Sequence, residues 1–172
     1  VIGKEKALVF DTGSGTDDIH GLIRRITGLP LVVINSHGHF DHIGGNGQFD
    51  TVYMHPDDFV ILESYTAEIL GKWRRELAPG QDGFCQLFEA GQWDKQRNNM
   101  KALDFDSFNL GGLECRVIPL RGHSRGSIGI WIPKRRLLLS GDALTPVMCL
   151  IFQNHMPVET QYHTLECVKD LD

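Results

Sequence analysis

The sequence predicts an α/β fold in which two packed β-sheets carry helices on their outer faces. Two observations lead to this prediction. The first half alternates short apolar runs with a helical segment, a βαβ pattern that favours a parallel sheet. The second half holds hairpin-connected strands followed by one helix, which favours an antiparallel sheet. The 172 residues suit a single domain, and 41% apolar with 23% charged residues is an ordinary globular composition.

The first elements form the βαβ unit. Residues 7–10 are an apolar run that ends at the turn sequence Asp11-Thr12-Gly13, which is typical of a strand closing in a turn. Apolar residues at helical spacing predict a helix over 19–26, after two aspartates and before Gly28 and Pro30. The continuous β-branched run over 31–34 predicts a strand that is covered on both faces.

Three less regular segments follow in the middle of the chain. Residues 52–54 are a short strand candidate, and Pro56 begins a long helix that we expect to continue to about Leu77. The segment 78–103 is rich in glycine and polar residues. It is expected to be a lid or an irregular insertion loop, and residues 78–99 are long enough to cover a site.

The second half is expected to contain four strands, over 105–110, 113–120, 127–132 and 137–139. Gly111-Gly112 marks the first hairpin turn between them, and residues 133–136 form another tight turn. A last helix begins near Val158, with Tyr162, Leu165 and Val168 on one face.

A dense group of metal-binding side chains follows the expected strand over 31–34. The segment SHGHFDHIGG places His37, His39, Asp41 and His42 within six positions, in a chain with eight histidines. Ligands tend to bind at the carboxyl ends of strands in such sheets. In an extended turn, His37 and His39 point to the same side and can coordinate one metal ion together. Asp41 and His42 point elsewhere if a helix begins there, and they can serve a second ion. Imidazole with carboxylate suits zinc, iron or manganese.

Two later residues have the same context. His123 follows the strand over 113–120 in RGHSRGSIG, and Asp142 follows the strand over 137–139 in SGDAL. Taken alone, His123 fits a turn residue and Asp142 fits a helix cap equally well. Together with the first cluster, they complete a set of ligands for two metal ions.

The ordered motifs resemble those of the metallo-β-lactamase superfamily. HGHFDH matches the H-x-H-x-D-H signature, and FDTG, GHSRGSIG and SGDA surround it in the family's order. The resemblance implies an αββα four-layer sandwich with a metal site along one edge of the two sheets. It also implies a first metal ion held by His37, His39 and His123, a second held by Asp41 and His42, and a bridging Asp142.

The chain departs from the family's pattern at both ends. Members usually have strands before the FDTG strand and a further histidine, a ligand of the second metal, after the last helix. We therefore expect residues 1–172 to form one metallo-β-lactamase-like domain that lacks N-terminal strands and the C-terminal strand with that histidine. His155 in FQNHMP could line the pocket, whereas His163 falls in the last expected helix, where a surface or packing role is favoured.

The expected function is that of a metal-dependent hydrolase. One or two zinc ions, or iron or manganese in their place, lower the pKa of bound water from about 15.7 toward about 7. The resulting hydroxide attacks an ester, thioester or lactone, and Asp41 is the expected catalytic residue that orients it or moves its proton. Asp142 makes the chain similar to glyoxalase II-type thioesterases and lactonases, because the best-known zinc β-lactamases have cysteine there.

Two other functions stay open. Persulfide dioxygenases share this fold and use one iron held by two histidines and one aspartate, which match His37, His123 and Asp142 here. The second alternative is a metal-binding module without catalytic activity. The missing final histidine is the reason to consider it.

The composition of the chain argues against nucleic acid and membrane as binding partners. A formal net charge of −5 gives no broad attraction to nucleic acid, and no apolar stretch approaches the roughly 18 residues of a membrane span. A small-molecule substrate is the expected partner, and the sequence does not indicate an oligomeric state. The four cysteines form no C-x-x-C pair, which indicates reduced thiols in a cytoplasmic protein.

Overall fold

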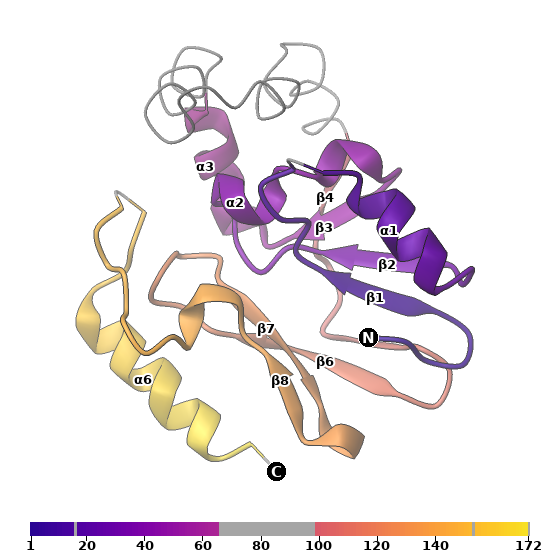
Figure 1. Ribbon diagram of the computed structural model, residues 1–172. Helices are drawn as coiled ribbons and strands as arrows, with labels where there is room; N and C mark the ends of the chain where they lie inside the picture. Colours follow the sequence, from indigo (N-terminus) through magenta and orange to yellow (C-terminus); the bar gives the residue numbers. More distant parts are fainter. Residues whose placement is uncertain (16, 66–98, 153, 172) are drawn as a thin grey trace.

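The computed structural model describes residues 1–15, 17–65, 99–152 and 154–171. Two four-stranded sheets form its centre, with strand orders β1-β2-β3-β4 and β5-β6-β7-β8. Figure 1 shows α1 on the outer side of the first sheet and α6 on the outer side of the second. The predicted arrangement of two sheets between helices is therefore confirmed.

The first sheet is parallel throughout. It contains β1 (Ala7–Phe10), β2 (Leu31–Ile34), β3 (Val52–Met54) and β4 (Met100–Ala102), and α1 (Ile19–Ile26) connects β1 to β2. The α1 helix begins after Asp18, whose carboxylate accepts a hydrogen bond from the N–H of Gly21 at 2.7 Å. The first three strands and α1 lie where the sequence predicts them.

Strand β4 corrects the expectation of an irregular loop over 78–103. Its three residues pair in parallel with β3, from Val52 with Met100 to Met54 with Ala102. The sequence Met-Lys-Ala has no strand signature of its own, so this pairing depends on a partner far away in the chain. Residues 78–98 of the expected loop lie outside the described residues.

Both faces of the first sheet are covered, as the apolar run over 31–34 predicts. Successive strand residues point to opposite faces. Leu8 and Ile34 belong to the buried cluster that lies between the two sheets. Their neighbours Val9 and Val33 belong to a separate cluster, which includes the inner residues of α1. The first sheet is thus fixed from both sides, which holds its strand ends in place.

The second sheet is antiparallel. It contains β5 (Ser107–Asn109), β6 (Glu114–Pro119), β7 (Ile128–Ile132) and β8 (Leu137–Leu139). Asn109 closes the β5–β6 turn, because its side-chain oxygen accepts from the N–H groups of Gly111 and Gly112 at 2.8 and 2.9 Å. The turn η4 (Pro133–Arg135) joins β7 to β8. The four predicted strands of this half are confirmed with slightly shorter bounds.

The expected long helix over 56–77 is divided. A 3-10 turn, η2 (Pro56–Asp58), comes first, and α3 (Phe59–Ser64) follows it. Tyr65 has extended backbone angles and ends α3. Residues 66–77 of the predicted helix lie outside the described residues.

The last predicted helix is confirmed as α6 (Val158–Lys169), and its inner face is polar. Tyr162 and Leu165 are exposed, at 60% and 42% of their surface, whereas Gln161 and Thr164 are buried. The Gln161 amide donates to the carbonyl of Ala143 at 2.9 Å, and the Thr164 hydroxyl donates to the carbonyl of Arg121 at 2.6 Å. Polar contacts to two loops, rather than an apolar stripe, therefore decide which side of α6 faces inward.

Helices in the described part of the chain are all too short or too polar to cross a membrane. Cys115, Cys149 and Cys167 carry free thiols, and Cys85 lies outside the described residues. The cytoplasmic location stays a prediction.

The two sheets bring several strand ends to one edge of the molecule. β1 and β2 are parallel, so their carboxyl ends lie together. β6 and β8 are both antiparallel to β7, so their carboxyl ends also share one edge. The histidine-rich segments come directly after these ends.

Candidate metal centre

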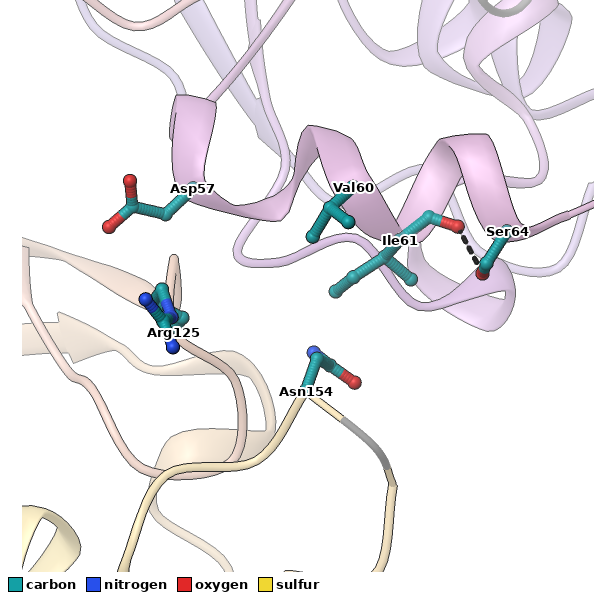
Figure 2. A pocket seen from close by; sticks show the side chains of 6 residues that line it. All are labelled: Asp57, Val60, Ile61, Ser64, Arg125 and Asn154. Atoms are coloured by element: carbon teal, nitrogen blue, oxygen red, sulfur yellow. Dashed lines mark hydrogen bonds between the residues drawn. The ribbon is translucent and has the colours of Figure 1, made fainter.

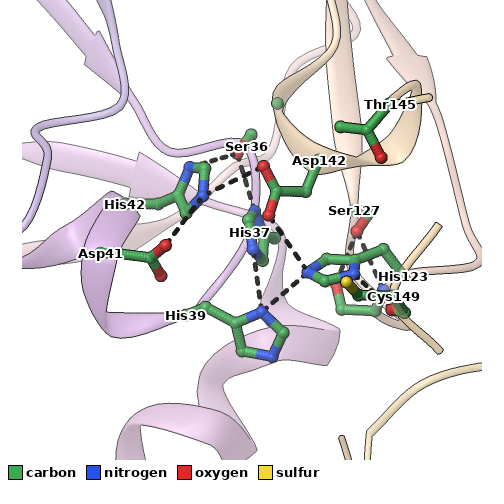
Figure 3. A network of polar contacts seen from close by, with 12 residues as sticks. Ser36, His37, His39, Asp41, His42, His123, Ser127, Asp142, Thr145 and Cys149 are labelled. Atoms are coloured by element: carbon green, nitrogen blue, oxygen red, sulfur yellow. Dashed lines mark hydrogen bonds and ion pairs between the residues drawn. The ribbon is translucent and has the colours of Figure 1, made fainter. Parts of the chain in front are cut away.

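The six predicted site residues meet at this edge (Figure 3). The turn after β2 supplies His37 and His39, and α2 (Phe40–Ile43) supplies Asp41 and His42. The loop after β6 supplies His123, and the turn η5 (Gly141–Ala143) after β8 supplies Asp142. Segments about eighty and a hundred positions apart in the chain thus converge. The role of each residue stays a prediction, but their proximity is a feature of the structure. Five of them form two overlapping groups, His37 with His39 and His123, and His37 with His42 and Asp142, and Asp41 lies 3.7 Å from His42.

Three buried imidazoles form the inner part of the cluster, which we call the imidazole site. His37, His39 and His123 are exposed over only 1%, 6% and 2% of their surface. His39 Nδ1 lies 3.0 Å from His37 Nε2 and 2.9 Å from His123 Nε2. Ligand nitrogens around a tetrahedral zinc ion are about 3.3 Å apart, given bond lengths of about 2.0 Å. An ion therefore fits here with a small outward movement of the rings.

The outer nitrogen of each imidazole faces an acceptor. His37 Nδ1 lies 2.8 Å from the hydroxyl of Ser36, and His123 Nδ1 lies 2.8 Å from the carbonyl of Cys149. The Ser36 hydroxyl donates its proton to the carboxylate of Asp11 at 2.8 Å, so the hydroxyl oxygen accepts from His37 Nδ1. His39 Nε2 lies 3.3 Å from the side-chain oxygen of Asn154.

These contacts assign the tautomers. Each outer nitrogen carries the proton, so the three inner nitrogens present lone pairs to one another. Three converging lone pairs repel unless a proton or a cation lies between them. Second-shell acceptors of this kind also fix the orientation of metal-binding histidines. The donor set of the imidazole site therefore fits a metal ion.

Burial keeps two ligands of this site, His37 and His39, free of competing protons. Burial lowers the pKa of His37 well below its ordinary value, and the neighbouring imidazoles of His42, His39 and His123 lower it further. Burial and the nearby His123 also lower the pKa of His39. A neutral imidazole is the form that binds metal. Both ligands are thus ready to bind a cation near neutral pH.

The outer part of the cluster, which we call the mixed site, holds His42 with Asp41 and Asp142. His42 Nε2 lies 3.3 Å from Asp142 Oδ1 and 3.7 Å from Asp41 Oδ2. The other oxygen of Asp142 lies 3.7 Å from His123 Nε2, so this carboxylate spans the two sites. The side chains of Asp41 and Asp142 are exposed over 53% and 41% of their surface, against 15% for His42.

The charge of the mixed site favours a cation. His42 Nδ1 donates to Asp11 at 2.8 Å, so its Nε2 faces the two carboxylates. Burial lowers the pKa of His42, but the hydrogen bond and charge of Asp11, with Asp41 and Asp142, outweigh burial and raise it to about 8. A proton on Nε2 is therefore stabilised between two carboxylates. A metal ion in place of that proton satisfies the same three groups.

Asp58 connects the loops that carry the imidazole site, although the sequence interpretation missed it. It is fully buried, and its carboxylate accepts from Gly38 N at 3.0 Å, Ser124 Oγ at 2.6 Å and Gly126 N at 2.7 Å. Gly126 has to be glycine, because a Cβ there would lie 2.7 Å from Asp58 Cγ. We call this arrangement the Asp58 clamp, since it ties the turn after β2 to the loop after β6.

Asp11 was also missed as a site residue. It accepts from the N–H and hydroxyl of Ser36 and from His42. Its φ of 65° lies in the left-handed region, which aspartate tolerates better than most residues. Its place at a strand end, within FDTG, was the available signal. Asp58 had no such signal, because an acidic residue after Pro56 is typical of any helix start.

The two remaining histidine candidates lie outside the cluster. His155 is exposed and its Nδ1 contacts the carbonyl of Met156 at 2.9 Å. His163 is exposed on α6, where its ring lies against Tyr162. Neither belongs to the two groups of potential metal ligands found in the described part of the chain.

A family model described as the metallo-beta-lactamase superfamily matches residues 1–172. The chain is 32% identical over 164 residues to the acyl-coenzyme A thioesterase MBLAC2 of Bos taurus, covering 84% of this chain and 56% of that protein. It is 27% identical over 168 residues to the hydroxyacylglutathione hydrolase of Bdellovibrio bacteriovorus, covering 97% and 55%. It thus spans just over half the length of these curated relatives.

Solved structures show the same architecture. The crystal structure of TTHA1623 in a di-iron-bound form superposes with a TM-score of 0.64 at 25% sequence identity, covering 96% of this chain and 76% of that one. The αββα sandwich expected from the sequence is therefore the fold of this chain.

Proposed function

The chain belongs to the metallo-beta-lactamase superfamily, and from that premise we propose that it is a metal-dependent hydrolase of ester-type bonds, with thioesters as its substrates. One observation carries the proposal: five potential ligand side chains form two overlapping groups at one edge, Asp41 lies beside them, and the rings of the imidazole site are held in the metal-binding tautomer. The names of the two curated relatives, a thioesterase and a hydroxyacylglutathione hydrolase, support the choice of bond, because acylglutathiones are also thioesters.

We assign the ligands by site. His37 Nε2, His39 Nδ1 and His123 Nε2 would hold one ion, and Asp41 with His42 Nε2 a second, with Asp142 between the two. Three nitrogens with an open fourth position are typical of catalytic zinc, and we propose zinc at both positions. A bound ion supplies a Lewis acid that polarises the substrate carbonyl and lowers the pKa of a coordinated water.

The protein's own groups orient the reactants. Ser36, Asn154 and the carbonyl of Cys149 fix the rings of the imidazole site, so the ligand atoms need little rearrangement. Asp41 is half-exposed at the open side of the cluster, where its Oδ2 could orient the attacking water or accept its proton. Hydrolysis adds water across the acyl–sulfur bond and releases a carboxylic acid and a thiol. No serine or cysteine nucleophile is required.

Purified protein loaded with zinc, manganese or iron tests the proposal. Thioester, lactone and phosphodiester substrates are compared with and without a chelator, and elemental analysis gives the metal content. We expect metal-dependent turnover of thioesters above the other two classes. Bound metal without any turnover would favour the non-catalytic alternative. Iron as the sole metal, with oxygen uptake on glutathione persulfide, would favour the dioxygenase.

A further inference from the structure

A pocket of about 560 Å³ lies beside the imidazole site and has no assigned role. One wall comes from η2 and α3, and the other from the loop after β6 and the loop before α6 (Figure 2). Its lining residues are Asp57, Val60, Ile61, Ser64, Arg125 and Asn154. Asn154 also contacts His39 Nε2 at 3.3 Å, so the pocket and the imidazole site share a wall. We call this space the Arg125 pocket.

The guanidinium of Arg125 lacks an anionic partner among the described residues. Asp57 is the acidic residue of the pocket, but its carboxylate pairs with Arg121 at 3.5 Å and lies 3.8 Å from His55 Nδ1. The charge of Asp57 is thus already balanced by another cation. Arg125 is exposed, and no described residue balances the positive charge that it contributes to the pocket.

A second donor in the same wall has no acceptor. The side-chain nitrogen of Asn154 is buried and makes no hydrogen bond, because its side-chain oxygen is the atom that contacts His39. A buried donor without a partner costs free energy, and a ligand oxygen would remove that cost. Val60 and Ile61 supply an apolar surface on the opposite wall, which belongs to α3. The pocket therefore combines donors without acceptors and an apolar wall.

We propose that the Arg125 pocket binds the carrier part of an anionic thioester, and that Arg125 is a specificity-determining residue. The inference rests on the proposed thioester hydrolysis at the neighbouring metal centre. A carboxylate or phosphate of the carrier pairs with the guanidinium, which binds both groups through two parallel hydrogen bonds. The aliphatic part of the carrier lies along Val60 and Ile61, and the thioester carbonyl reaches the imidazole site.

The experiment compares carriers that differ in charge. Acetyl thioesters of coenzyme A, glutathione and N-acetylcysteamine present phosphates, carboxylates and no charge on one acyl group. The matching S-ethyl thioethers cannot be hydrolysed, so their dissociation constants measure binding without turnover. Both sets are measured with the full metal-loaded chain, with Arg125→Gln, and with Arg25→Gln, an exposed change of equal charge on α1.

In Arg125→Gln, we expect the preference for an anionic over the neutral carrier to fall about tenfold in kcat/KM and in dissociation constant, because a charged hydrogen bond is lost. Arg25→Gln should keep the wild-type preference. The carrier that loses affinity identifies phosphate or carboxylate as the group recognised. Equal preferences in the wild type and Arg125→Gln would overturn the proposal.

The thioethers separate this inference from the proposed function. If no thioester is hydrolysed but Arg125→Gln still weakens the anionic thioethers, the pocket is correct and the assigned reaction is wrong. If thioesters are hydrolysed without regard to carrier charge, the reaction is correct and the role of Arg125 is wrong.

Discussion

The imidazole site and the mixed site are neighbours that bind cations by different means. The imidazole site is buried and contains no carboxylate, and each ring is held by its own acceptor. The mixed site is half-open, and two of its three side chains are exposed carboxylates. His42 alone has a fixed orientation there, through Asp11. Preorganised geometry therefore favours the first ion, and charge favours the second.

This difference predicts which changes in solution conditions or in sequence should weaken the binding of each ion. Screening by salt and competition by protons act on exposed charges more than on buried neutral ligands. Geometric damage acts most strongly where the ligands are held rigidly. Substitutions should thus affect metal binding at the two sites to different extents. Because Asp142 spans both sites, an ion at one site should change the affinity of the other.

The largest effect is expected from His39→Ala. This change removes the nitrogen that lies within 3.0 Å of both other imidazoles, so tight metal binding at the imidazole site should be lost. Turnover should fall about a thousandfold or more, since a catalytic metal supplies several kcal/mol of transition-state stabilisation. Elemental analysis and thioester kinetics measure the two losses.

The fold should survive His39→Ala, because His39 lies in a turn outside the three apolar clusters. Circular dichroism and thermal unfolding check this expectation. His163→Ala on the surface of α6 is the matched control and should change neither metal content nor turnover. Unchanged metal content in His39→Ala would contradict the ligand assignment.

Asp58→Asn should weaken the imidazole site next most strongly. An amide places an NH₂ group where the carboxylate now accepts from a backbone N–H, either at Gly38 or at Gly126 in the two possible orientations. One of these N–H groups then loses its partner, which costs about 1–3 kcal/mol. The two loops separate, and metal affinity should fall about 10- to 100-fold.

Competition titration with a chromophoric chelator measures this affinity, and the exposed Asp50→Asn change is the control. A stability loss without any change in metal affinity would show that the Asp58 clamp supports the fold but does not position the ligands.

The role of Asp58 also shows what could not be predicted from the sequence. The described strands other than β4 and the H-x-H-x-D-H segment were predictable, because apolar runs and closely spaced ligands are local patterns. Asp58 acts through Gly38, Ser124 and Gly126, which are 20, 66 and 68 positions away, and nothing in its own segment indicates those partners. Which face of α6 points inward was not predictable for the same reason, since Gln161 bonds to a loop carbonyl. Long-range polar contacts have no local signature.

Asp11→Asn should act on the mixed site. Asparagine tolerates the left-handed backbone that Asp11 adopts, so the turn should persist. Asparagine has no charge and only one acceptor oxygen for the donors of Ser36 and His42, so His42 is held less firmly and affinity for the second ion should fall about tenfold. The imidazole site should lose less, because Asp11 reaches His37 only through Ser36.

Metal stoichiometry under limiting zinc tests this separation, with the exposed Asp106→Asn as the control. We expect Asp11→Asn to bind one ion tightly and the second weakly. Equal loss at both positions would show that the two sites form one unit and that the comparison between them is wrong.

The last effect concerns stability rather than metal affinity, and it depends on pH in the metal-free protein. The pKa of His42 is about 8 in the folded state, against 6.5 for its ordinary value, a difference of 8 − 6.5 = 1.5. The folded state holds this proton more tightly, so the stabilisation is complete below pH 6.5 and is lost as the pH rises through 8. It amounts to about 2 kcal/mol at most.

Urea unfolding of the metal-free chain at pH 6.5 and at pH 9 tests this expectation. The free energy of unfolding should decrease between these two pH values, and the decrease should be smaller in His42→Gln than in the wild type. The pKa values of His37 and His39 are shifted the other way, so their contributions are lost only as the pH falls below 6.5 and do not obscure this window. His163→Gln should follow the wild type. Zinc should abolish the difference, because an ion on His42 Nε2 takes the place of the proton. Equal pH dependence in the metal-free wild type and His42→Gln would show that Asp11, Asp41 and Asp142 do not hold a proton on His42. The charge of the mixed site would then give no support to a second cation.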